Sequence, residues 1–268
     1  MRSATNENMA VDGLVGQQLA ELYRALGEGG VGLLITGHMY VSKDVGRASP
    51  KQGALYDDRF VPGLAKAVSA AAESGCKVFV QLSHAGAKAA PEDPASQPVA
   101  PSACEILPGR PARALTVEEI GGIRADFIAA AVRAKAAGAH GVQVHLAHNY
   151  LLSEFLTPQY NTRTDLYGGT AEKRMALPLS IIAGIKEACG ASFPILVKLN
   201  GHVEQGDDVY QRDLSTYARL LKQAEVAAIE VSHYDFAQKG HCYNEDRALL
   251  VKRAVSYTHL DVYKRQVT

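Results

Sequence analysis

Short apolar segments alternate with longer amphipathic segments along most of this chain of 268 residues. The apolar segments are rich in Val, Ile and Leu, a composition typical of buried strands. They lie at Val31–Thr36, Lys77–Ser83, Gly141–His145, Pro194–Leu199 and Ala227–Ser232. Strands that alternate with helices favour βα units and a parallel sheet, so we expect one α/β domain.

The segments between these strands carry helix signals. A capping box, in which Thr116 is followed three residues later by Glu119, predicts a helix start. Pro178 should kink another helix, because proline lacks an amide hydrogen. The first predicted helix has its apolar face between Leu19 and Leu26 and stops at Gly29–Gly30. The other predicted helices span Phe60–Ser74, Thr116–Ala137, Thr170–Ala188 and Leu214–Ala224.

A long segment rich in Pro, Ala and Ser separates His84 from Ala114. Loops of this length are uncommon in compact domains unless they are functional or disordered. We interpret this segment as a cover over the strand ends, with a tolerated surface insertion as the alternative.

Composition narrows the class of partner. The chain has 28 basic and 28 acidic residues, so no net charge attracts it to nucleic acid or to an anionic membrane. It shows neither an apolar run long enough to span a membrane nor a signal peptide at its start. The four cysteines form no Cys-x-x-Cys pair, which favours reduced thiols and a cytoplasmic location. We expect a small-molecule partner and leave a homo-oligomer open.

The strongest candidate for chemistry lies where the third predicted strand ends. His145, His148 and Tyr150 occur within six residues, and they can converge only if the strand stops near His145 and turns. Imidazole and phenol groups donate hydrogen bonds to carbonyl oxygens and transfer protons near neutral pH. Two alternatives are a metal held by the histidine pair and a purely structural role.

The segment from His145 to Arg174 resembles the old yellow enzyme family of flavin-dependent ene-reductases and NADH:flavin oxidoreductases. The family pattern is His-x-Ala-His-Gly-Tyr-Leu, then Phe-Leu-Ser-Pro, then Asn-x-Arg-x-Asp-x-Tyr-Gly-Gly and Glu-Asn-Arg. This chain departs from it at Asn149, Thr157 and Lys173, where the family has Gly, Ser and Asn. A match over some thirty positions is a specific signal. The later motif residues are interpreted as scaffold: Asn161, Arg163, Asp165, Tyr167, Gly168 and Gly169.

The resemblance implies a TIM (β/α)8 barrel that binds flavin mononucleotide (FMN) and takes hydride from NADH or NADPH. By this resemblance Gln81 pairs with the flavin pyrimidine edge, Thr5 bonds the flavin O4, and Lys198 lies beside N1 and O2. Gly37 sits under the ring, and His145 also contacts the cofactor. Each of these residues also has an ordinary structural interpretation. Gln81 would be a polar residue at a strand end, and Thr5 would have no special role. Gly37 would simply end a strand, and Lys198 would be a surface lysine whose charged end reaches solvent.

The implied reaction reduces an activated alkene of the enone or enoate type. His145 and His148 would hold the activating oxygen, and Tyr150 would be the general acid. One alternative is a metal-dependent lyase on the same barrel. A dihydrouridine synthase-like barrel acting on RNA is disfavoured by the neutral charge.

A closed barrel needs eight strands, and the sequence predicts five; the family resemblance implies that a sixth ends near Arg2–Thr5. We therefore expect a truncated barrel domain over residues 1–254, incomplete at both ends, and an inactive fragment is another alternative. Residues 255–268 resemble a translated adaptor and are expected to be a non-native tail.

Overall fold

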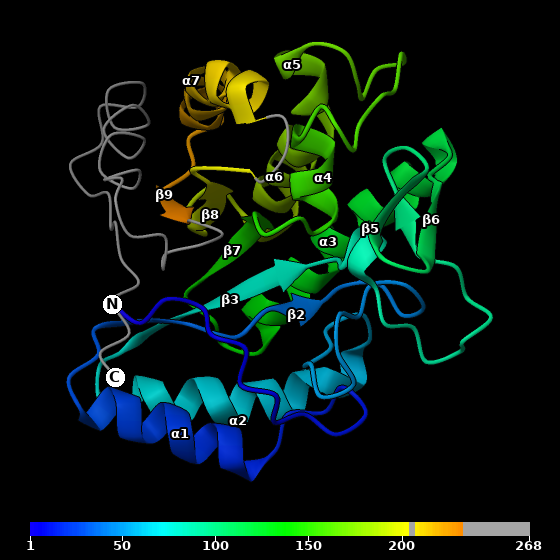
Figure 1. Cartoon of the computed structure of the whole chain (residues 1–268). Helices are drawn as coiled ribbons and strands as arrows, with labels where there is room; N and C mark the ends of the chain where they lie inside the picture. Colours follow the sequence, from blue (N-terminus) through cyan, green and yellow to red (C-terminus); the bar gives the residue numbers. More distant parts are fainter. Residues whose placement is uncertain (204–206, 233–268) are drawn as a thin grey trace, which may run out of the picture.

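The computed structural model describes residues 1–203 and 207–232 (Figure 1). The predicted tail at 255–268 lies outside these residues. The helices are α1 (Gln17–Glu28), α2 (Val61–Ala72), α3 (Val117–Ala136), α4 (Leu151–Leu156), α5 (Ala171–Arg174), α6 (Ala176–Cys189) and α7 (Asp207–Gln223), with short 3-10 turns η1 (Asp58–Phe60) and η2 (Gly86–Lys88). The strands are β1 (Leu33–Ile35), β2 (Met39–Tyr40), β3 (Lys77–Ser83), β4 (Val99–Ala100), β5 (Cys104–Leu107), β6 (Arg110–Ala114), β7 (Gly141–Leu146), β8 (Ile195–Asn200) and β9 (Ala228–Ser232).

A parallel sheet in the order β1-β3-β7-β8-β9 forms the centre of the described part, with β2 paired to the end of β3. The five strands predicted from the sequence are therefore confirmed. Arg2 continues the sheet beyond β1, because its amide donates to Leu33 O at 2.7 Å and its carbonyl accepts from Ile35 N at 3.0 Å. The start of the chain thus lies alongside β1, where the sixth strand was expected to end.

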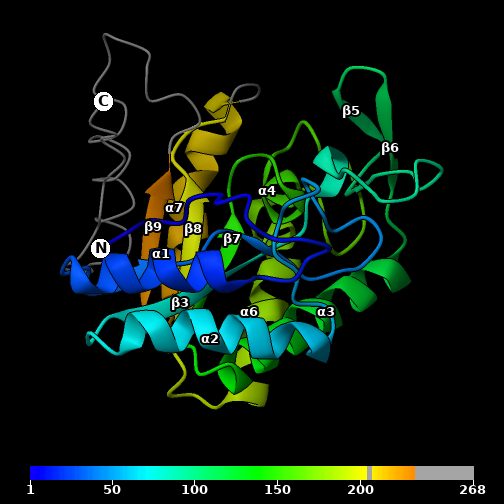
Figure 2. The ribbon, with the colours of Figure 1, turned by 90° about the horizontal axis from the view of Figure 1, so that it is seen from below.

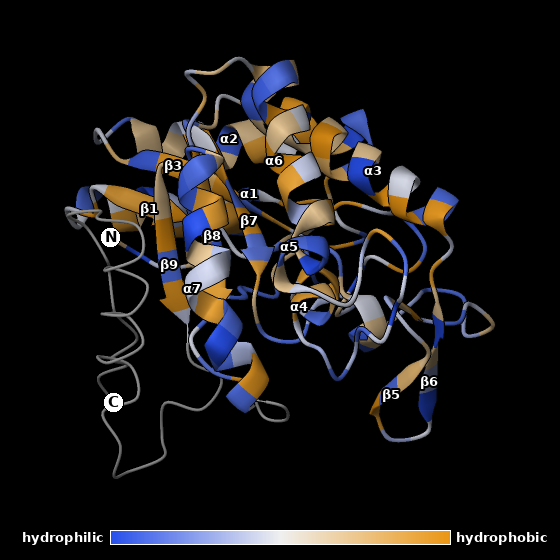
Figure 3. Ribbon diagram, turned by 90° about the horizontal axis from the view of Figure 1, so that it is seen from above, coloured by the Kyte–Doolittle hydropathy of each residue, from blue (hydrophilic) through white to orange (hydrophobic). Residues whose placement is uncertain are grey.

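The two faces of this curved sheet bury different layers. On the outer face, residues such as Leu34, Val80, Val144 and Val197 join the large core formed with the helices. Helices α1 and α2 lie side by side across this face (Figure 2), and apolar residues concentrate on the strands and on α2 and α6 (Figure 3). The inner face begins with a small apolar layer of Ala4, Ile35, Phe79 and Leu196. Alternation along each strand produces this division.

Three segments differ from the sequence-based expectation. The cover from His84 to Ala114 is not a plain loop, because it contains a small sheet in the order β4-β6-β5 beyond the end of β3 (Figure 1). The predicted helix Thr170–Ala188 is two helices, α5 and α6, separated at Met175. This break places Pro178 in the first turn of α6, where a missing amide hydrogen costs nothing, so it starts a helix rather than kinking one. Helix α7 begins before the predicted Leu214.

The capping box at the start of α3 is confirmed. The Thr116 side chain accepts from Glu119 N at 3.1 Å, and the Glu119 carboxylate accepts from Thr116 N at 2.8 Å. This helix leads into β7 and so fixes where the candidate catalytic strand begins. Within the described ranges, no helix is long and apolar enough to cross a membrane.

Two glycines give a matched test of the packing. A methyl group on Gly141, the first residue of β7, would overlap the Phe79 ring and lie 2.6 Å from the Pro194 carbonyl oxygen. A methyl group on Gly121, on an exposed face of α3, would meet nothing within 4 Å. We expect Gly141→Ala to destabilise the fold by about 1–3 kcal/mol through overpacking. Gly121→Ala should stabilise it by about 0.5–1 kcal/mol, because alanine is the better helix former. Urea unfolding of both variants checks this, and equal shifts of one sign would contradict it.

Candidate active site

A cavity of about 140 Å³ opens on the inner side of the sheet, beside the turn that follows β7. Its lining residues are Ala4, Thr5, Asn6, His38, Gln81, His145, His148, Tyr150 and Lys198. The structure therefore brings together, from five separate segments, every predicted site residue except Gly37. This grouping is what a barrel site built from strand ends requires.

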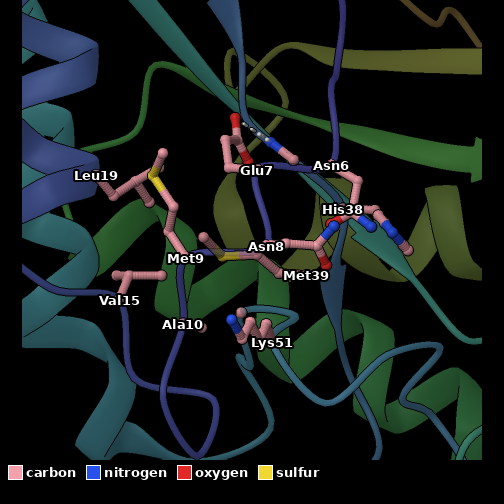
Figure 4. Close-up of a pocket in the computed structure, with 12 residues that line it drawn as sticks. Asn6, Glu7, Asn8, Met9, Ala10, Val15, Leu19, His38, Met39 and Lys51 are labelled. Atoms are coloured by element: carbon pink, nitrogen blue, oxygen red, sulfur yellow. Dashed lines mark hydrogen bonds between the residues drawn. The ribbon is translucent and has the colours of Figure 1, made fainter.

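Gly37 instead lines a neighbouring cavity of about 20 Å³ (Figure 4). Its amide donates to Glu7 Oε1 at 3.3 Å, which is the dashed bond in Figure 4. A side chain on Gly37 would overlap the Glu7 carboxylate and lie 2.7 Å from the Thr5 carbonyl oxygen. The packing of the N-terminal segment is thus sufficient reason for a glycine here, and a contact between Gly37 and a cofactor stays a prediction.

The turn after β7 has a special backbone. His148 and Asn149 adopt φ angles of 65° and 52°, in the left-handed region that Asn and His tolerate better than most residues. This conformation explains why asparagine can replace the glycine of the family pattern at position 149. The turn is held from both sides, because His148 N donates to Asn200 Oδ1 at 2.9 Å and Lys88 Nζ donates to His148 O at 3.0 Å.

This turn packs four rings into one cluster. The His145 ring lies 5.0 Å from His148 and 5.2 Å from Tyr150 between centroids, both edge to face. On the other side, His38 stacks on Tyr150 at 5.1 Å with an interplanar angle of 23°. The His148 ring is tied to the end of β9 by a 2.7 Å hydrogen bond between its Nε2 and Ser232 Oγ. The predicted convergence of His145, His148 and Tyr150 therefore matches the geometry.

Beneath the rings lies a buried polar network with one side chain from each of four neighbouring strands. Gln81 Nε2 donates to Gln143 Oε1 at 2.6 Å, and Gln143 Nε2 donates to Glu230 Oε2 at 2.9 Å. Lys198 Nζ donates to Glu230 Oε1 at 2.8 Å and to Ser3 Oγ at 3.1 Å. Lys198 is only 1% exposed, so it is a buried cation with a specific partner rather than a snorkelling surface lysine.

Glu230 is ionised in this network. Burial acts to raise the pKa of its carboxyl group, but the Lys198 ammonium and the hydrogen bonds from Lys198, Ser3 and Gln143 outweigh burial and hold the pKa below its ordinary value. The inner face of the sheet therefore carries a neutralised pair of opposite charges next to the cavity.

Sequence reasoning missed three residues of this site: His38, Gln143 and Glu230. Gln143 and Glu230 interrupt buried apolar strands at positions that pair across the sheet with predicted residues, Gln81 with Gln143 and Lys198 with Glu230. A polar side chain inside a buried strand was the available signal. For His38, the signal was only its place just after Gly37, at the end of a predicted strand.

The segment after the turn makes structural hydrogen bonds, in agreement with the predicted scaffold role. Asn161 Nδ2 donates to the carbonyls of Phe155 at 2.8 Å and Tyr167 at 2.7 Å. Arg163 Nη1 donates to the carbonyls of Pro101 and Leu115, which flank the small sheet. These bonds attach the cover to the active-site loop. As for the alternative of a metal centre, the described residues contain no group of three or more His, Cys, Asp or Glu placed to hold an ion.

Replacing Lys198 with Met should expose the cost of the buried charge. The change leaves the Glu230 carboxylate buried without its counter-ion, which we expect to destabilise the fold by about 3–5 kcal/mol at neutral pH. A carboxyl group with a depressed pKa contributes stability above its unfolded pKa of about 4.3, and this contribution is lost as pH falls through the folded pKa. The loss in Lys198→Met should therefore shrink as pH falls, because the unpaired carboxyl becomes protonated in the folded variant and the wild type loses its own contribution below about pH 4.3; urea unfolding across pH measures this.

The double variant Lys198→Met/Glu230→Gln is the control. It removes both charges and should recover most of the lost stability, whereas an equal loss in both variants at every pH would contradict the assignment.

Comparison with known proteins identifies relatives of this chain. Residues 1–256 match the model of the NADH:flavin oxidoreductase / NADH oxidase family. An NADH oxidase of Thermoanaerobacter brockii is 39% identical over 226 residues, covering 82% of this chain and 34% of that protein. An NADPH dehydrogenase of Bacillus cytotoxicus is 35% identical over 210 residues, covering 78% of this chain and 58% of that protein.

Solved structures agree with this match. Morphinone reductase superposes with a TM-score of 0.84 at 26% identity, covering 95% of this chain and 73% of its own. The old yellow enzyme homologue from Zymomonas mobilis gives 0.81 at 26% identity, covering 93% and 74%. These neighbours are TIM barrels, so the predicted barrel class is confirmed, and the described strands form an arc of one.

Proposed function

Because this chain belongs to the NADH:flavin oxidoreductase / NADH oxidase family, we propose that its cavity is the flavin and substrate site of an oxidoreductase. The enzyme takes hydride from NADH or NADPH, through FMN, to an activated carbon–carbon double bond. The chain spans 34% of the NADH oxidase and 58% of the NADPH dehydrogenase, so the activity of the whole protein is part of this proposal. One observation carries it: the ring cluster of Tyr150, His145 and His148 shares a cavity with buried Gln81 and Lys198.

Gln81 and Lys198 fit the pyrimidine edge of a flavin. That edge presents an N–H donor between carbonyl acceptors, and an amide can pair with both kinds of group. In the described part of the chain, Gln81 uses one amide N–H for Gln143, which leaves its oxygen and second N–H for a ligand. Lys198, paired with Glu230, would place an ammonium group near the part of a bound flavin that becomes negative on reduction. Thr5, at the rim, adds a hydroxyl. When bound, FMN supplies the hydride chemistry that no side chain has.

The ring cluster supplies the rest of the chemistry. His145 and His148 lie edge to face and present imidazole groups to the same cavity, where they would hold the oxygen that activates the alkene. A hydrogen-bonded oxygen withdraws electron density from the double bond and makes its β-carbon electrophilic. Tyr150 contacts both His38 and His145 and would deliver the proton to the α-carbon. The fixed turn keeps these groups in one geometry, which reduces the entropy lost on reaching the transition state.

Tyr150→Phe separates the two half-reactions. We expect the flavin-loaded variant to be reduced by NADH or NADPH at the normal rate and to reduce an enone more slowly by about two to four orders of magnitude, because general acid catalysis is lost. Stopped-flow absorbance of the flavin follows each half-reaction. Equal slowing of both would show that Tyr150 holds the flavin or the fold instead of donating the proton.

A phenol ligand tests the histidine pair. Bound above the oxidised flavin with its oxygen on His145 and His148, a phenolate should give a long-wavelength charge-transfer band. His148→Ala should weaken binding about tenfold by removing one hydrogen bond, and Ser232→Ala, which only loosens the ring, should have a smaller effect. Stoichiometric zinc in the purified protein, lost together with activity on chelation, would favour the metal-dependent lyase.

A further inference from the structure

His38 lines the same cavity and has no role in the reaction proposed above. It lies between β1 and β2, just before Met39, and is 8% exposed. Figure 4 shows its ring beside Asn6 and Asn8 of the N-terminal segment, and it lines the small cavity as well as the larger one. Its ring therefore forms part of the wall between the two cavities.

The hydrogen bonds around His38 fix which ring nitrogen carries the proton. Ala48 N donates to Gln52 Oε1 at 2.7 Å, which orients the Gln52 amide with its nitrogen toward His38. That nitrogen donates to the His38 carbonyl oxygen at 3.0 Å and lies 3.0 Å from Nδ1 of the ring. Since Gln52 Nε2 can only donate, Nδ1 must accept, and the proton of the neutral ring is on Nε2.

The ring is also neutral, and its Nε2 is directed away from these partners. Burial lowers the pKa of His38 to about 4, so the imidazole is uncharged at neutral pH. Ser83 Oγ, the other polar atom near the ring, lies 3.1 Å from Nδ1 and not from Nε2. Within residues 1–203 and 207–232, no hydrogen bond reaches Nε2. An N–H that lines the cavity without a protein acceptor is a donor that a bound ligand can use.

The position of this N–H relative to the histidine pair defines what it can bind. The His38 ring stacks on Tyr150, and its centroid lies 6.3 Å from that of His145. At this separation the two rings can each hold a separate acceptor of one small ligand.

We infer that His38 is a substrate-binding residue whose Nε2–H holds a second carbonyl, so that the site takes alkenes flanked by two carbonyl groups. The inference rests on the proposed function, in which His145 and His148 hold the first carbonyl. A single-carbonyl substrate that fills the cavity leaves the His38 donor without a partner, and sites built to hydrogen-bond a group discriminate against analogues that lack it.

The test compares two substrates that differ only in the second carbonyl: cyclohexenone and the cyclohexene-dione that carries another carbonyl across the ring. His38→Phe is the variant, because phenylalanine keeps the stacked ring and Gln52 Nε2 still donates to the carbonyl of residue 38 and to Ser83 Oγ. In the flavin-loaded protein, the ratio of kcat/KM for the dione to that for the enone should fall about tenfold, the worth of one hydrogen bond.

Binding supplies a readout apart from turnover. The saturated cyclohexane-dione and cyclohexanone cannot be reduced, and their Kd values follow from the change in flavin absorbance. The preference for the dione should also fall about tenfold in His38→Phe. An unchanged ratio in both measurements overturns the role of His38 and leaves the proposed function standing. Failure of the wild-type protein to reduce either alkene overturns the proposed function, while the binding ratio still decides the role of His38.

The tautomer can be measured without any variant. Nitrogen-15 spectra of the histidine rings in the wild-type protein should show one neutral imidazole protonated at Nε2 and accepting at Nδ1, assigned to His38 by its loss in His38→Phe. Gln52→Glu replaces the donor at Nδ1 with a carboxylate, so the Nδ1 signal should become protonated. A wild-type His38 protonated at Nδ1 overturns the inference.

Discussion

The ion pair between Lys198 and Glu230 is the interaction on which the inner face of this sheet depends. Each charge alone would be strongly unfavourable at this depth, and only the partner and the surrounding hydrogen bonds make its burial tolerable. Gln143 satisfies the second oxygen of Glu230 and links it to Gln81, so β3, β7, β8 and β9 each contribute one member. The strand register is specified by this network as well as by the apolar outer face, because a slip of one residue would turn every member outward.

The layers above and below the network follow from the same alternation. Below it, Phe79 and Leu196 close the inner face with apolar side chains, and Gly141 leaves room for the Phe79 ring. Above it, β7 stops after Leu146, and the left-handed turn carries His148 over the cavity. The site is therefore a buried polar network beneath a cluster of rings, with the network held by side-chain hydrogen bonds and the turn held through its backbone at His148.

The parts of this arrangement that could be predicted are those with a local signal. Short apolar runs gave the central strands, Thr116 and Glu119 gave a helix start, and the His145–Tyr150 motif gave the ring cluster. The small sheet between His84 and Ala114 could not be predicted, because its strands are only two to five residues long and β6 contains a proline. The roles of Glu230 and His38 could not be predicted either, because they depend on partners that are distant in sequence. Glu230 pairs with Lys198, 32 residues away, and His38 with Gln52, 14 residues away.

Strand β9 supplies both Glu230 and Ser232, and so it gives the site an order of assembly. Until β9 docks, Lys198 lacks its counter-ion and the His148 ring lacks the hydroxyl that holds it. A folding intermediate made of the earlier strands would contain the whole ring motif yet present it in no single orientation. The site could then bind its ligands in one geometry only after β9 docks. Partly folded chains would therefore bind a small-molecule substrate poorly.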